Sequence, residues 1–129
     1  MSEVVDPFVP QDRLLLVSIA KTVGSRSVYD ATRYAWPVSR QRVENEVDLV
    51  LGCVRGVVEG VFVASAWLDA SPGKATERNF PELVATHKGP RLGFVGRKAN
   101  EAVQTKYLGK RVPNDLAIGQ NGFRYFRMT

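Results

Sequence analysis

The chain has little of the chemistry that the commonest metal and disulfide sites need. Its 129 residues include one cysteine, Cys53, and one histidine, His87. A single cysteine excludes an internal disulfide, which fits a reducing compartment, so we expect a cytoplasmic location. One Cys and one His cannot supply the four ligands of a structural zinc site. We therefore expect no metal ion and no cofactor.

Long apolar runs and nucleotide-binding motifs are also lacking. No apolar run approaches the roughly 20 residues of a membrane span, and the acidic Glu3 and Asp6 replace the basic start of a signal peptide. We therefore expect no membrane partner. There is no Walker motif, and the glycines within 52–60 are spaced by four within a predicted pair of strands and its turn, unlike a dinucleotide fingerprint.

The sequence does not indicate a catalytic centre. The carboxylates are scattered, with Asp48 and Glu59 on or beside predicted strands. His87 falls in a long loop, where a lone histidine is typically solvated, and Ser-His-Asp chemistry would depend on that residue alone. We expect a binding protein rather than an enzyme, while a general-base role for His87 stays open.

The residues that are present suit one basic domain. Hydrophobic residues make up 44% of the chain and charged residues 24%, enough for a core inside an ordinary globular surface. We expect a single domain over residues 1–129, with 1–12 as a lead-in. The net charge of +5 is compatible with a polyanionic partner such as nucleic acid.

Hydrophobic patterning predicts an α+β fold. Ser27 and Ser39 are candidate helix N-caps, Arg55-Gly56 is a turn signal between two strands, and Gly60 is a candidate bulge. Because repeated βαβ units are lacking, the order of the predicted strands and helices favours a mixed, mainly antiparallel curved sheet or open pseudo-barrel with two to three helices. The strands are expected over 13–20, 48–54, 57–68, 91–97 and 123–127, the helices over 28–36, 40–46 and 98–109, and a long loop over 69–90.

A stripe of alternating cations and aromatics runs along the first predicted helix. Arg26, Tyr29, Arg33 and Trp36 are spaced three, four and three apart, which predicts one helical face. Guanidinium groups can hold phosphates and aromatic rings can stack a base. The alternative is that Tyr29 and Trp36 belong to the core and the arginines cover its edge. Basic residues continue just beyond the stripe, at positions 40 and 42.

Three further places carry polar or aromatic groups of interest. Trp67 ends a long strand, either as a core residue or as a stacking platform. Lys106, Lys110 and Arg111 follow the last helix, where cations oppose the helix dipole and a ligand role stays open. Gln120 and Asn121 stand between two glycines, and either form a simple turn or present amides that can read a base edge.

An ordered set of short segments carries a resemblance to a known family. "ATRYAW", "LVLGCVRGVVEGVF", "RLGFVGRKA", "YLGKRVP" and "GQNGFRYF" cover most of residues 31–126. Together they resemble small PUA-like domains of the EVE/ASCH type, sometimes found beside GIY-YIG-type nuclease modules. That family usually has proline after Gln-Asn, where this chain has Gly122. The resemblance implies a pseudo-barrel that recognises nucleic acid. The positions that correspond to its site are Arg33, Trp36, Trp67, Gln120 and Asn121.

These observations lead to one hypothesis and two alternatives. We expect a nucleic-acid-binding module in which basic residues hold the backbone of DNA or RNA, an aromatic ring stacks a plain or modified base, and amides read its edge. One alternative is a small-molecule-binding or hydrolytic enzyme that uses the same cleft. The other is a protein-interaction module. The candidate ligand-binding residues are Arg26, Tyr29, Arg33, Trp36, Trp67, Gln120 and Asn121.

Overall fold

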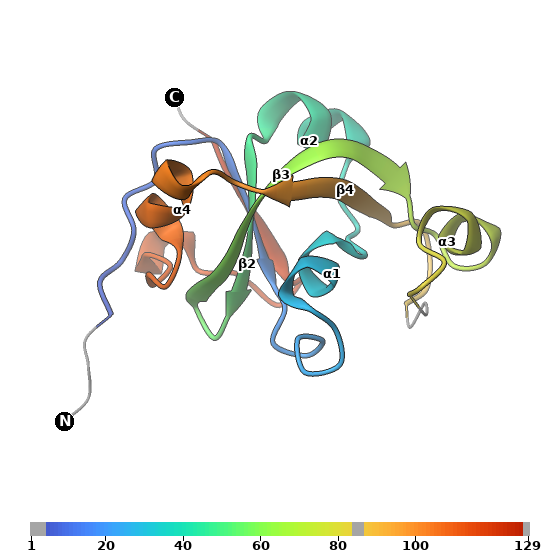
Figure 1. Cartoon of the computed structure of the whole chain (residues 1–129), viewed down its shortest axis with the longest axis horizontal. Coiled ribbons are helices and arrows are strands. Elements are labelled where there is room, and N and C mark those ends of the chain that lie inside the picture. The colour runs from blue at the N-terminus through green and yellow to red at the C-terminus, as the bar shows by residue number, and fades with distance from the viewer. Residues whose placement is uncertain (1–4, 84–86, 128–129) are drawn as a thin grey trace.

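The computed structural model describes residues 5–83 and 87–127, and their strands form one mixed sheet in the order β4-β3-β2-β1-β5 (Figure 1). β1 and β2 pair in parallel, and the other three pairings are antiparallel. Within the described residues the sheet does not close into a barrel. The predicted α+β class with a mixed, mainly antiparallel sheet is therefore confirmed. The strands are β1 (Leu14–Ser18), β2 (Leu49–Val54), β3 (Val57–Asp69), β4 (Leu92–Lys98) and β5 (Phe123–Phe126).

The β2–β3 hairpin has the turn and the bulge that its sequence predicts. Arg55 and Gly56 both have positive φ, 50° and 79°, as a two-residue type I′ turn requires. The pairing register shifts beside Gly60, so Glu59 has no partner on β2. A second shift in β3 lies near Ser65. Such bulges increase the local twist of the sheet.

Within the described residues, four short α-helices and one 3-10 turn accompany the sheet. The side chain of Ser27 accepts a hydrogen bond from the backbone N–H of Asp30 at 3.1 Å, and Ser39 accepts one from Arg42 at 3.4 Å. Both predicted N-caps are therefore confirmed. The helices are α1 (Val28–Arg33), α2 (Arg40–Glu46), α3 (Lys74–Asn79) and α4 (Glu101–Tyr107), and the 3-10 turn is η1 (Asn114–Leu116).

Two expectations about the helices are wrong. α1 ends at Arg33 rather than near residue 36, because Tyr34 is extended and Trp36 pairs with Leu92 as a β-bridge. α3 lies inside the segment predicted as a loop. It starts after Gly73, which offers no side-chain cap, and burial of Phe80 just beyond it anchors the segment. Tertiary contacts therefore override weak local signals at both places.

Each face of the sheet has its own core, and the two cores follow the alternation along β1. Leu14 and Leu16 pack on the side of α4, with Tyr107. Leu15 and Val17 pack on the side of α1 and α2. Figure 1 shows α4 and α1 on opposite sides of the sheet, with α3 at the far end of the β3–β4 ribbon. The C-terminal end of β1 thus lies between two covered faces.

Candidate functional site

A cleft of about 640 Å³ opens beside the C-terminal end of β1. Four chain segments that are far apart in the sequence form its walls. They are the turn after β1, the segment after α1, the loop that precedes β4 and the turn that precedes β5. The lining residues are Ser18, Ala20, Lys21, Thr22, Arg26, Tyr34, Ala35, Trp36, His87, Arg91, Gly119, Gln120, Asn121 and Gly122.

The turn before β5 contributes two amide side chains to the lining of the cleft. The N–H of Gly122 donates to the carbonyl of Gly119 at 3.1 Å, and the carbonyl of Gly122 accepts from the N–H of Ser18 at 2.8 Å. Gln120 and Asn121 therefore occupy the corner of a turn that is tied to β1. Both are exposed, and neither side chain has a hydrogen bond within the described residues. Their amide groups are available to a ligand.

Trp36 is held rigidly at the wall of the cleft. Its backbone exchanges two hydrogen bonds with Leu92, at 2.8 and 2.9 Å, and its indole N–H donates to the carbonyl of Thr32 at 2.7 Å. The ring is half-buried. Because the indole N–H is already used, what Trp36 can offer to a ligand is its π surface, which suits stacking.

The charge of the cleft is positive. Lys21, Arg26 and Arg91 line it, and no Asp or Glu does among the described residues. The guanidinium of Arg26 lies 5.2 Å from the ring centroid of Tyr34. Since no carboxylate is part of the described lining, the cleft favours an anionic ligand over a cationic one.

Two further cavities adjoin the cleft and carry more arginines. One, of about 370 Å³, shares Ser18 with the cleft and is lined by Arg55 and Arg111. The other, of about 510 Å³, shares the turn before β5 and is lined by Arg42 and Arg124. Among the described residues, neither cavity has an Asp or Glu in its lining. A basic surface therefore surrounds the 117–122 segment.

The structure brings together four of the seven candidate residues. Arg26, Trp36, Gln120 and Asn121 all line the cleft. The expectation that Arg26 and Trp36 share a helical face is wrong, because one precedes α1 and the other follows it. The two residues reach the cleft from the turns at either end of the helix.

Tyr29 and Arg33, both in α1, do not line the cleft and instead contact neighbouring parts of the fold. The hydroxyl of Tyr29 accepts a hydrogen bond from the N–H of Gly96 at 2.9 Å. The Nε of Arg33 lies 2.8 Å from Asp30, and its side chain is only 13% exposed. The same guanidinium lies 5.1 Å from the ring centroid of Phe80. Tyr29 therefore packs against the core and Arg33 covers its edge, as the alternative interpretation of the stripe predicted for these two residues.

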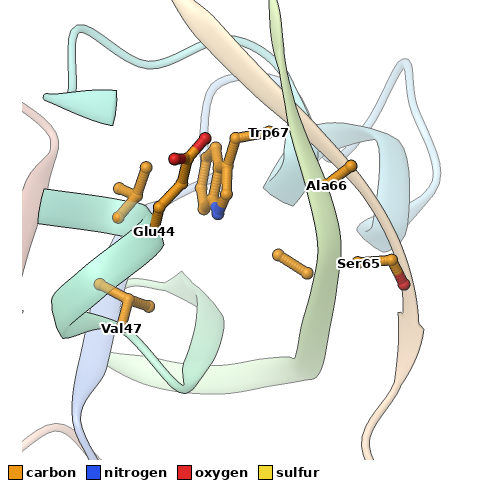
Figure 2. Close-up of a pocket in the computed structure, with 7 residues that line it drawn as sticks. Glu44, Val47, Ser65, Ala66 and Trp67 are labelled. Carbon is orange, nitrogen blue, oxygen red and sulfur yellow. The ribbon is translucent and has the colours of Figure 1, made fainter. Parts of the chain in front are cut away.

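Trp67 is also a core residue, and the cavity that it lines is a different one. Its side chain is 7% exposed and packs with Phe94, at a ring-centroid distance of 5.1 Å. Figure 2 shows the indole beside Glu44 of α2, at a cavity of about 350 Å³ between α2 and β3. A carboxylate at that cavity disfavours an anionic ligand. Trp67 therefore does not line the cleft that contains Trp36 and Gln120.

Sequence reasoning missed several cleft residues, of which His87 is the most informative. His87 is half-buried rather than solvated. Its Nε2 lies 2.9 Å from the carbonyl of Ala70, and its ring packs edge-on against Tyr34 at 5.5 Å. A hydrogen bond to a carbonyl requires Nε2–H, which leaves Nδ1 as an acceptor in the neutral ring. No local pattern indicates this position, because it depends on contacts across the fold.

Comparisons of the chain with protein-family models, with curated proteins and with solved structures find no match. Within the described residues, no helix is long and apolar enough to cross a membrane. In the same residues, no three His, Cys, Asp or Glu side chains are grouped so that they could hold a metal ion. The features that bear on function are therefore the geometry and the charge of the cleft.

Proposed function

We propose that this protein is a nucleic-acid-binding module that takes one unpaired base of DNA or RNA into the cleft, without catalysing a reaction. The open α+β sheet is compatible with the PUA-like architecture that the sequence resembles. Fold alone is a weak warrant for function, so the proposal rests on the site. A cytoplasmic location remains part of the proposal, on the basis of the single, buried Cys53.

One observation carries the proposal, namely the segregation of charge around the 117–122 segment. The chain has 18 Lys and Arg residues and 13 Asp and Glu residues. The cleft and its two neighbouring cavities are lined by cations and, in the part of the chain that the structure describes, by no carboxylate. Such a surface suits a phosphate backbone. The cations are Lys21, Arg26, Arg42, Arg55, Arg91, Arg111 and Arg124.

The cleft also offers the groups that hold a base. Trp36 supplies a rigid aromatic surface whose N–H is already satisfied, and base–aromatic stacking contributes about 1–3 kcal/mol per base. Gln120 and Asn121 present amide donors and acceptors in the same lining, and an amide can pair with a base edge through two hydrogen bonds. Aromatic and amide groups thus line one concavity, as the hypothesis requires.

A small-molecule-binding or hydrolytic enzyme is the second candidate, because His87 lines the cleft. The hydroxyls of Ser18 and Thr22 lie in the same lining, but no carboxylate does among the described residues. A histidine base without a carboxylate to orient it lacks the third member of a triad. Binding therefore has more support than hydrolysis.

The protein-interaction alternative finds less support in the surface. Among the described residues, the large hydrophobic side chains that are exposed are Val5, Val9 and Leu108. No aromatic ring is among them. A docking surface of exposed aromatics is therefore not found in this part of the chain.

Amide chemical shifts of the ¹⁵N-labelled protein would test the proposal directly. On addition of a short mixed-sequence single strand of DNA or RNA, we expect changes at the cleft walls, above all around Trp36, Arg91 and Gln120. The amide of Ser65, on β3 beside the separate cavity of Figure 2, is the internal control and should not move. Changes confined to the surroundings of Ser65, or no changes at all, would contradict the proposal.

A further inference from the structure

The cavity beside the β2–β3 turn has the composition of a phosphate site. We infer that it holds the backbone phosphate next to the base in the cleft, through Arg55 and Arg111. This inference rests on the proposed function and adds a second, separate contact point to it. The cavity has a volume of about 370 Å³ and lies between the hairpin turn and the segment that follows α4.

Arg111 is fixed at the wall of this cavity by its neighbours. Its backbone N–H donates to the carbonyl of Asp6 at 2.9 Å, and its carbonyl accepts from Phe8 at 3.0 Å. One guanidinium nitrogen donates to the side-chain oxygen of Asn114 at 3.1 Å. An arginine has five N–H donors, so this bond orients the guanidinium and leaves donors for a ligand. The amide NH₂ of Asn114, also in the lining, has no partner within the described residues.

Arg55 approaches the same cavity from the tip of the hairpin. It is exposed, and its positive φ of 50° places it in the turn itself. The turn is tied to the opposite wall, because the N–H of Val112 donates to the carbonyl of Gly56 at 2.7 Å. Two arginines from different segments therefore line one cavity that is held together by a backbone hydrogen bond. Convergent guanidinium groups are the usual means of binding phosphate.

The lack of an ion pair within the described residues distinguishes Arg55 and Arg111 from Arg42, on the other side of the cleft. Arg42 is 3.0 Å from Glu46, and its guanidinium stacks on the ring of Tyr125. In contrast, neither Arg55 nor Arg111 forms an ion pair within the described residues. A phosphate at Arg55 and Arg111 would therefore not compete with a carboxylate of the protein.

Ser18 connects the cavity to the cleft. It lines both, it is exposed, and its hydroxyl has no hydrogen bond within the described residues. A base and the phosphate of its own nucleotide are separated by a single sugar, so adjoining sites are what one nucleotide requires. The only thiol in the lining, Cys53, is buried, and burial raises its pKa to about 12. It stays protonated at neutral pH, which leaves the guanidinium groups to carry the charge of the cavity.

The test is the salt dependence of binding to a fluorescein-labelled single strand of about 12 nucleotides, as DNA and as RNA, for Arg55→Asn, Arg111→Gln and the double variant. Asn is chosen at 55 because it tolerates positive φ. Arg97→Gln is the matched control, since Arg97 is exposed on β4, lines none of the three cavities and forms no ion pair within the described residues. We expect each single variant to reduce the slope of log K against log salt by about 0.7 and the double variant by about 1.4, with Arg97→Gln unchanged.

A second arm separates phosphate binding from a general change in charge. With a strand whose linkages are uncharged methylphosphonates, the double variant should bind as the wild type does. If the double variant keeps the wild-type slope while Arg91→Gln still weakens binding, the phosphate-site inference is wrong. The proposal that the cleft binds a base is then retained. If the wild type binds neither DNA nor RNA, both proposals fall together. If Arg97→Gln reduced the slope of log K against log salt as much as the Arg55 and Arg111 variants do, the inference would also be overturned.

Discussion

Gly122 and Trp36 are neighbours in the lining of the cleft. A Cβ atom on Gly122 would be 3.6 Å from Cζ3 of the indole, which is an ordinary van der Waals contact. The backbone of Gly122 has a φ of 86°, a value that residues other than glycine rarely adopt. The turn that carries Gln120 and Asn121 is therefore constrained by its backbone conformation rather than by lack of space.

Gly122→Ala should destabilise the protein through that conformation. A non-glycine residue in the left-handed region costs about 1–2 kcal/mol, so we expect the free energy of unfolding in urea to fall by roughly that amount. Gly24→Ala is the control, because a Cβ there meets nothing within 4 Å and the backbone has no positive φ. Equal stabilities of the two variants would contradict the account of the turn.

Gln120→Ala should change recognition without changing stability. Gln120 is exposed and has no hydrogen bond within the described residues, so the melting temperature should stay close to that of the wild type. If its amide reads a base edge, affinity for the preferred sequence should fall by roughly 1–3 kcal/mol, while salt-sensitive binding to a scrambled sequence persists. Equal loss on both sequences, or no loss on either, would show that this residue confers no specificity.

His87→Ala should leave the fold and the binding nearly intact. The carbonyl of Ala70 that lies 2.9 Å from His87 also lies 3.1 Å from the hydroxyl of Thr76, so a second donor is within reach in the variant. We expect affinity for a single strand to change by less than about 0.5 kcal/mol, within the range of substitutions that break no key contact. Loss of a measured hydrolytic activity with unchanged melting would instead favour the enzyme alternative.

Tyr107 should give the protein a marked sensitivity to alkaline pH. Its hydroxyl donates to Asp12 at 2.6 Å, and burial, aided by that hydrogen bond, raises its pKa to about 12. The unfolded phenol ionises near pH ~10, so its contribution is complete below pH ~10 and is lost as the pH rises through the folded-state value. We expect the melting temperature of the wild type to fall steeply between these limits.

Tyr107→Phe tests that explanation. It removes hydrogen bonds to Asp12 and from Gln11, so stability at neutral pH should fall by about 1–3 kcal/mol. The melting temperature of the variant should fall less steeply at alkaline pH than that of the wild type. Part of the fall should persist because the pKa of Cys53 is also raised. Thermal melting at several pH values checks this. Parallel pH profiles for the two proteins would rule out Tyr107 as the source.

Much of the fold was predictable because its signals are local. Ser27 and Ser39 cap helices through their own hydroxyls, and the Arg55-Gly56 turn needs only the positive φ of two neighbouring residues. The parallel pairing of β1 with β2 and the presence of α3 were not predicted, because both depend on contacts between distant segments. Helix α3 in particular starts at a glycine without a side-chain cap.

The candidate site was predictable only in part, for the same reason. The turn residues Gln120 and Asn121 stand out because amides between glycines suit neither strand nor core. The spacing of Arg33 and Trp36 predicts that both lie on one helical face, but α1 ends between them. Arg33 therefore forms an ion pair with Asp30, whereas Trp36 lines the cleft. His87 and Arg91 reach the same cleft through tertiary folding alone, which no spacing in the sequence reveals.

The most direct test of the central claim is the affinity of the wild-type protein for a short single strand as salt rises from about 50 to about 200 mM. Fluorescence anisotropy with labelled DNA and RNA strands of about 12 nucleotides measures it. The account predicts clear binding at the lowest salt and a steep loss of affinity, because cations that contact phosphates release counterions. Failure to bind either strand at the lowest salt, or an affinity that does not change with salt, would contradict it.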